Sequence, residues 1–211
     1  MATHKEKEAT KVTKIGIPGV IEKRLNINLT DIHRHRRLSN YLLLLWRHSG
    51  IAHSFSPITN GILSTIGSLT FVPAFLQAWT LCRYNELRFI SILAIKGHSP
   101  FFIKSSKGSL DRQVNPLPVY KIATLRGIDP AAKVLVVSYD KYSHDIKQAQ
   151  RFINMPDTKN ILDKTHIFRH LECTWRKQQG ESTKEISGFM GHKSDKTTLK
   201  YIHKDWKFTS S

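Results

Sequence analysis

Three short stretches near the end of this chain decide how it is interpreted: Thr165-His166-Ile167-Phe168-Arg169-His170, then Met190-Gly191-His192, then Thr197-Thr198-Leu199-Lys200-Tyr201. On a helix His166 and Arg169 are three positions apart, so both side chains project from one face. Thr165 is predicted to cap that helix, which places both side chains in its positive first turns. The first stretch therefore predicts a helix end that favours an anion such as a phosphate.

The order and spacing of the three stretches carry more information than any one of them. His192 stands 23 positions after Arg169, and Tyr201 stands nine positions after His192. This array resembles the catalytic domain of the tyrosine recombinases, the phage-integrase family. The boxes of that family are His-x-x-Arg, usually followed by His, then Leu-Gly-His or Leu-Gly-Trp, then a tyrosine after a Thr-Thr pair. The resemblance covers residues 57–211 and is most specific at these boxes.

The resemblance implies a further arginine upstream, within a box of the form Gly-x-Arg-x-x-Glu-Leu in an apolar helix. The stretch from Glu86 to Ile95 fits it, with Arg88 as the arginine. It departs twice from the pattern, because Glu86 replaces the glycine and Ser91 replaces the acidic residue. Arg83 is the alternative.

The family also carries a lysine in the turn of a β-hairpin. Lys107-Gly108-Ser109-Leu110-Asp111-Arg112 resembles its Lys-Gly-x-x-x-Arg pattern. Lys107 is therefore the expected lysine, and Lys104, three positions earlier, is the fallback.

The function implied by the resemblance is that of a site-specific DNA recombinase or integrase, which cleaves and rejoins DNA through a 3′-phosphotyrosyl intermediate. Covalent catalysis conserves the bond energy, so no cofactor and no metal is expected. Arginines suit the phosphate because their planar groups are permanently charged. The expected catalytic residues are Arg88, Lys107, His166, Arg169, His192 and Tyr201.

Each of these residues has an expected role in the implied reaction. Tyr201 attacks the phosphorus, Lys107 protonates the leaving oxygen, and His166 accepts or relays the tyrosine proton. His192 is expected to hydrogen-bond a non-bridging oxygen. His170 either orients the site or is a packing histidine.

Two other functions stay open at this point. One is a type IB topoisomerase-like enzyme that nicks and rejoins DNA without exchanging strands. The other is a non-catalytic DNA-binding protein that retains the fold, since the first box departs from its pattern and the amino-terminal part is short.

The composition agrees with a nucleic-acid partner. The chain has 211 residues with 33 Lys and Arg against 16 Asp and Glu, a formal charge of +17. Such a charge attracts polyanions, and double-stranded DNA is the expected partner. The longest apolar run, Tyr41–Trp46, is too short to span a bilayer, and Met1–Lys14 does not resemble a signal peptide. Cys82 and Cys173 form no disulfide framework, so the expected location is the cytoplasm, or the nucleus for a eukaryotic mobile element.

The periodicity predicts a mainly α-helical α+β fold with one small antiparallel β-hairpin. Residues 1–56 are expected to form a basic arm and a short helical segment, and residues 57–211 the tyrosine recombinase-like catalytic domain. A homo-oligomer, the synaptic tetramer on DNA, is implied by the family. Helices are expected over Thr30–Arg47, Ile58–Gly67, Val72–Ile95 with a break near Tyr84, Ser143–Ile153, Thr165–Gln178, Ser182–Gly191 and Thr197–Tyr201, and strands over Phe101–Lys104 and Arg112–Leu117.

Overall fold

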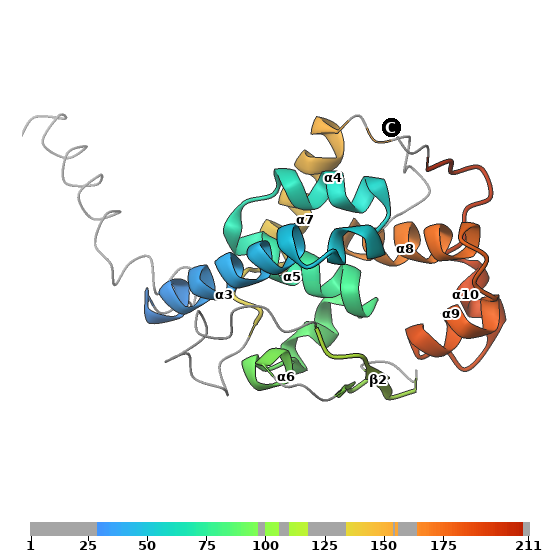
Figure 1. The fold of residues 1–211 in the computed structure, drawn as a ribbon, viewed down its shortest axis with the longest axis horizontal. Helices are drawn as coiled ribbons and strands as arrows, with labels where there is room; N and C mark the ends of the chain where they lie inside the picture. The colour runs from blue at the N-terminus through green and yellow to red at the C-terminus, as the bar shows by residue number, and fades with distance from the viewer. Residues whose placement is uncertain are drawn as a thin grey trace, which may run out of the picture.

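The structure is a computed structural model that describes residues 29–96, 100–105, 110–117, 134–153, 155 and 164–208. These residues form a mainly helical fold with one small sheet (Figure 1). The elements, in chain order, are α3 (Leu29–His48), η1 (Ile51–Ser54), α4 (Pro57–Thr65), α5 (Ser68–Thr80), η2 (Tyr84–Phe89), α6 (Ile92–Lys96), β1 (Phe101–Ile103), β2 (Arg112–Val114), α7 (Tyr139–Phe152), η4 (Lys164–His166), α8 (Ile167–Gln178), α9 (Thr183–Met190) and α10 (Asp195–Leu199).

Helix α3 packs along α5 and supplies one wall of the core. Its apolar side chains Leu38, Tyr41, Leu42 and Leu45 are buried, at the spacing that keeps them on one helical face. Of the basic side chains near its start, His33, Arg36 and Arg37 are exposed and Arg34 is half-buried. His35 is the exception, because it is buried and bonded through Nε2 to the carbonyl oxygen of Leu69, 3.0 Å away.

Helix α8 is the element that connects the core to the carboxyl-terminal part. It packs against α4, α5 and α9. In Figure 1, α9 and α10 lie together at the end of the molecule opposite α3. Ile167, Phe168 and Leu171 are fully buried on α8, and polar side chains of the same helix bond to residues on either side of α10.

The two strands pair antiparallel, with Phe102 opposite Gln113. Close packing joins β2 to the turn after α9. Gly191 has φ +70°, and a Cβ there would lie 2.6 Å from the carbonyl oxygen of Leu110. Its own carbonyl accepts a hydrogen bond of 2.8 Å from the Leu110 amide. Glycine is therefore required twice, by its conformation and by the approach of the hairpin.

Several predictions from local sequence signals are confirmed. Ser182 and Glu185 form the expected capping box, with bonds of 3.2 Å and 2.7 Å, and α9 ends at Gly191. The hairpin strands pair as predicted. None of the helices in the described ranges is long and apolar enough to cross a bilayer.

Other boundaries were predicted wrongly. The helical region expected over Val72–Ile95, with a break near Tyr84, is interrupted earlier, since α5 ends at Thr80 and is followed by the 3₁₀ helix η2 and the short α6. Thr165 does not cap α8, since the chain enters that helix through η4 and His166 holds the N-cap position without a side-chain cap bond. Helix α10 ends at Leu199, so Tyr201 lies just beyond it.

Candidate active site around Tyr201

The ring of Tyr201 is surrounded by polar and charged groups from α8 and from the turn after α9. It is half-buried, and its amide donates a hydrogen bond of 2.9 Å to the carbonyl of Thr198, which closes the chain after α10. The ring of His192 stacks on it with centroids 5.5 Å apart, and that of His170 lies 4.7 Å away. The guanidinium carbon of Arg169 is 5.0 Å from the tyrosine centroid. All four residues belong to the three sequence stretches quoted above.

Arg169 is the centre of this group and is fully buried. Its Nη1 donates to the carbonyl oxygen of Leu81, and its Nη2 lies 2.9 Å from Nε2 of His192. Leu81 has φ +50°, an uncommon value for a residue with a side chain, and this left-handed turn ends α5 beside Arg169. Burial lowers the pKa of Arg169, but an arginine starts so high that it remains charged at neutral pH.

The hydrogen bonds of His192 fix its tautomer. A guanidinium has no acceptor, so Arg169 must be the donor and Nε2 of His192 must carry a lone pair. The proton therefore lies on Nδ1, which donates to Thr198 Oγ1 at 2.8 Å. Burial, with the charges of Arg169, Arg83 and Arg112, lowers the pKa of His192 to about 4. At neutral pH this imidazole is uncharged and links Arg169 to α10.

Two more arginines lie beside Arg169, joined through Glu86. Arg83 Nη1 donates to Glu86 Oε1 at 2.9 Å, and Arg112 Nη2 approaches Oε2 at 3.3 Å. Glu86 is fully buried; burial alone raises its pKa, but the amide and side chain of Arg83 and the charge of Arg112 outweigh this and leave the pKa below its ordinary value. The charges of both arginines lower the pKa of Arg169, so the three guanidiniums lie close enough to interact electrostatically.

We call Arg83, Glu86, Arg112, Arg169 and His192 the arginine cluster. Within this cluster there are three guanidiniums and one carboxylate, that of Glu86, which bonds to Arg83 and Arg112. In addition, Nε of Arg169 and both Nε and Nη1 of Arg112 are buried and have no hydrogen-bond partner among the described residues. Buried donors without partners are costly. An anion with several oxygens would satisfy these donors and neutralise the excess charge.

The structure brings together four of the six predicted site residues: His166, Arg169, His192 and Tyr201. His166 stands at the start of α8, with its ring 6.3 Å from that of Tyr201. Arg88 is not part of this group. It is exposed on η2, where its charge acts on Tyr84. Lys107 lies outside the described residues, although Leu110, three positions later, is bonded to Gly191 next to His192.

Arg83 and Glu86 stand where Arg88 was expected. The sequence contained a signal for them, because the pattern Gly-x-Arg-x-x-Glu-Leu also fits Leu81-Cys82-Arg83-Tyr84-Asn85-Glu86-Leu87. In this register both the acidic residue and the leucine match, and Leu81 takes the place of the glycine. Its left-handed conformation is the one that glycine adopts most easily.

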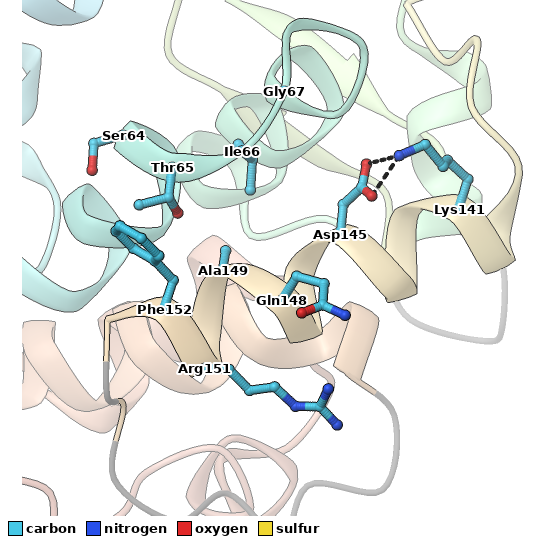
Figure 2. A pocket seen from close by; sticks show the side chains of 10 residues that line it. All are labelled: Ser64, Thr65, Ile66, Gly67, Lys141, Asp145, Gln148, Ala149, Arg151 and Phe152. Carbon is cyan, nitrogen blue, oxygen red and sulfur yellow. Dashed lines mark hydrogen bonds and ion pairs between the residues drawn. The ribbon is translucent and has the colours of Figure 1, made fainter.

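A separate groove lies away from the arginine cluster, between α7 and the turn that joins α4 to α5. Its cavity volume is about 710 Å³, and Ile66, Ala149 and Phe152 supply apolar lining. Figure 2 shows Lys141 bonded to Asp145 at one end of this groove. None of the residues that line this groove belongs to the arginine cluster, so the groove is separate from the site around Tyr201.

Comparison with known proteins gives little beyond the course of the chain. No family model matches the sequence, and no curated protein matches it. Among solved structures, the catalytic domain of bacteriophage HP1 integrase is similar in fold, with 15% identity over 83% of this chain and 84% of that chain and a TM-score of 0.43. A likeness of this degree says nothing of residue roles.

Proposed function

We propose that this chain is a DNA strand transferase of the tyrosine recombinase type, which cuts and rejoins a phosphodiester through Tyr201. The phenol oxygen attacks phosphorus, so a bond forms between that oxygen and the 3′-phosphate. The bond to the 5′-oxygen breaks, and the DNA strand leaves as a 5′-hydroxyl. The tyrosine gives up one proton and the 5′-oxygen gains one, which balances the step. Rejoining by a 5′-hydroxyl reverses it.

The observation that carries this proposal is the position of Tyr201 beside buried cationic donors that lack partners. A scissile phosphate placed against Arg169 and Arg112 would accept hydrogen bonds from their unpartnered nitrogens. These donors are already oriented before the phosphorus becomes five-coordinate and its oxygens gain charge. Preorganised donors of this kind are often the largest single contribution to catalysis.

The other roles follow from the surroundings of each group. We assign Arg83, rather than Arg88, to the phosphate-binding set, because it lies in the electrostatic neighbourhood of Arg169 and His192. His192 orients Arg169, since both of its ring nitrogens already have partners. His166 is the group to receive the tyrosine proton. Lys107 remains the proposed donor to the leaving oxygen, within three residues of Leu110 and its bond to Gly191.

The surface around Tyr201 suits a DNA backbone. Five lysines near it in the sequence are exposed: Lys193, Lys196, Lys200, Lys204 and Lys207. Contacts from such side chains to phosphates release counterions, so the affinity for DNA should fall steeply as salt rises. An affinity that hardly changes between low and high salt would count against DNA as the partner.

A nicked suicide substrate tests the chemistry, because loss of a short strand after cleavage traps the covalent complex. We expect a DNA–protein adduct with the natural chain and none with Tyr201→Phe. Tyr139→Phe is the matched control, since Tyr139 is an exposed tyrosine on α7 and should form the adduct normally. An adduct that persists in Tyr201→Phe would mean that another residue is the nucleophile.

A second assay, on supercoiled circular DNA together with a second DNA that carries a defined site, separates strand exchange from simple relaxation. A recombinase joins the cleaved strand to a second DNA that carries a defined site, whereas a topoisomerase-like enzyme reseals the original strand and relaxes supercoils at many sequences. We expect joining to a second site. Relaxation without such joining would replace the proposal with the topoisomerase-like function.

A further inference from the structure

Four rings form a continuous row that ends at Tyr201. Trp206 stacks on His203 with centroids 4.1 Å apart and planes 14° from parallel. His203 lies 5.0 Å from His170, whose ring in turn lies 4.7 Å from that of Tyr201. The ring of His170 therefore lies between those of Tyr201 and His203, and His203 follows Tyr201 by two positions in the chain.

The segment that carries these rings is tied to one face of α8. His170 Nδ1 lies 2.8 Å from His203 Nε2. One turn later, Thr174 Oγ1 donates to the carbonyl of Tyr201 at 3.2 Å and accepts from the amide of His203 at 3.0 Å. A further turn on, Gln178 Nε2 donates to the carbonyl of Trp206. Positions 170, 174 and 178 recur every four residues, so they share a face of the helix.

The bond between the two histidines requires one N–H and one lone pair facing each other. A neutral imidazole supplies one of each, whereas two protonated rings would both present a proton. Burial lowers the pKa of His203, although Asp205 opposes the effect. A neutral ring at position 203 therefore maintains this bond at neutral pH and fixes the orientation of the His170 ring.

We propose that His203 is a positioning residue for Tyr201 that acts through the ring of His170. The hydrogen bonds of Thr174 Oγ1 to the backbone of Tyr201 and His203 fix the position of the segment along α8. They do not restrain the side chain of Tyr201. The ring of His170 limits that rotation, and His203 prevents His170 from turning away. This inference rests on the proposed function, since the purpose of the arrangement is to direct the tyrosine oxygen toward the arginine cluster.

Three substitutions at position 203 separate positioning from a merely structural role. His203→Ala should slow adduct formation on the suicide substrate by about 10- to 100-fold with DNA affinity unchanged, because small misplacements of a reacting group are costly. His203→Gln should restore most of the rate, since its terminal nitrogen reaches nearly as far as Nε2. His203→Asn is too short and should stay slow. His53→Ala, at an exposed histidine on η1, is the control.

A rate for His203→Ala equal to that of the natural chain would overturn the proposal, and so would a His203→Gln variant as slow as His203→Ala. A natural chain that forms no adduct at all would instead overturn the proposed function. The two failures are therefore distinguishable.

A second measurement needs no DNA. In the full chain labelled with 3-fluorotyrosine, the ¹⁹F NMR signal of Tyr201, assigned by its loss in Tyr201→Phe, reports the surroundings of the ring. We expect this signal to shift in His203→Ala and to return in His203→Gln, while the signal of Tyr139 stays fixed in both. A Tyr201 signal that does not move in His203→Ala would overturn the positioning role, whatever the chain does to DNA.

Discussion

Two fully buried glutamates in this molecule differ in the partners that surround them. Glu86 contacts Arg83 and Arg112, and its pKa lies below the ordinary value despite burial. Glu172 lies on α8 and accepts from the amide of Ser56 at 3.1 Å. Burial raises the pKa of Glu172 to about 7, because hydroxyl and amide donors and the charge of Arg176 offset only part of the cost.

The difference shows what a buried charge requires. Glu172 bonds to neutral donors at the start of α4, and its pKa stays raised even with the charge of Arg176 nearby, whereas two guanidiniums bonded to Glu86 keep it an anion. Glu86 in turn keeps two arginines close together that would otherwise repel each other. The region around Glu172 thus joins two helices, and the region around Glu86 holds more positive than negative side chains, which is what the proposed phosphate site requires.

Removing the charged partner should have the largest effect. Glu86→Ala removes the buried carboxylate to which both Arg83 and Arg112 bond, and we expect a loss of about 3–5 kcal/mol in the free energy of unfolding. Urea titration measures this loss. Asp140→Ala removes an exposed carboxylate at the start of α7 and should cost under about 1 kcal/mol. Equal costs for the two variants would show that Glu86 is not the counter-charge of the cluster.

The next largest effect should fall on the reaction. Arg169→Lys keeps the positive charge but loses the planar fork that reaches Leu81, His192 and the substrate, so we expect adduct formation to slow about 10²- to 10³-fold, or roughly 3–4 kcal/mol. Arg176→Lys is the control, two turns along the same helix and beside Glu172 instead. A similar rate for both variants would remove Arg169 from the catalytic set.

A smaller effect should appear in the pH dependence of stability. Folding raises the pKa of Glu172 from 4.5 to about 7. As pH rises between these values, this carboxyl ionises in the unfolded chain before it does in the folded chain, so the folded state loses stability. As pH rises from about 5.5 to 7, the free energy of unfolding of Glu172→Gln should therefore increase by about 2 kcal/mol relative to that of the natural chain. Thermal unfolding across this range measures the gain. For Glu86 the sign is opposite, since its lowered pKa adds stability that is lost in acid. A Glu172→Gln advantage independent of pH would contradict the raised pKa.

The smallest effect is expected at Arg88. This exposed residue should tolerate Arg88→Ala with a stability change of less than about 0.5 kcal/mol and no change in the rate of adduct formation. Arg83→Ala, five positions earlier, should slow the reaction. If the two variants behaved in the opposite way, the register of the first box would return to Arg88.

The boxes in the last third of the chain could be predicted because each is a local signal. The capping box of α9 and the glycine stop at Gly191 depend on neighbours within a few residues. The spacing between Arg169, His192 and Tyr201 in the sequence then links these local signals into one pattern. In the structure, the short α9 and α10 fold these three residues back onto one end of the molecule.

The first box was harder to place, because neither register of its pattern has the glycine: Leu81 takes that position in one and Glu86 in the other. Arg83 and Arg88 are five positions apart, and each is close to Glu86 in sequence. The choice depends on where α5 ends, which is set by the left-handed turn at Leu81, and on which arginine the hairpin residue Arg112 approaches through Glu86. Both are tertiary facts. The contact of His203 with His170 is also tertiary, because 33 positions separate the two rings.

The most direct measurement is to locate the DNA on the protein by mass spectrometry. The trapped adduct is digested with nuclease and protease, and the peptide that retains a nucleotide is sequenced. The expected result is a nucleotide joined through its 3′-phosphate to the phenol oxygen of Tyr201. A nucleotide found on any other side chain, or joined through a 5′-phosphate, would contradict the role given to Tyr201 and to the arginine cluster beside it.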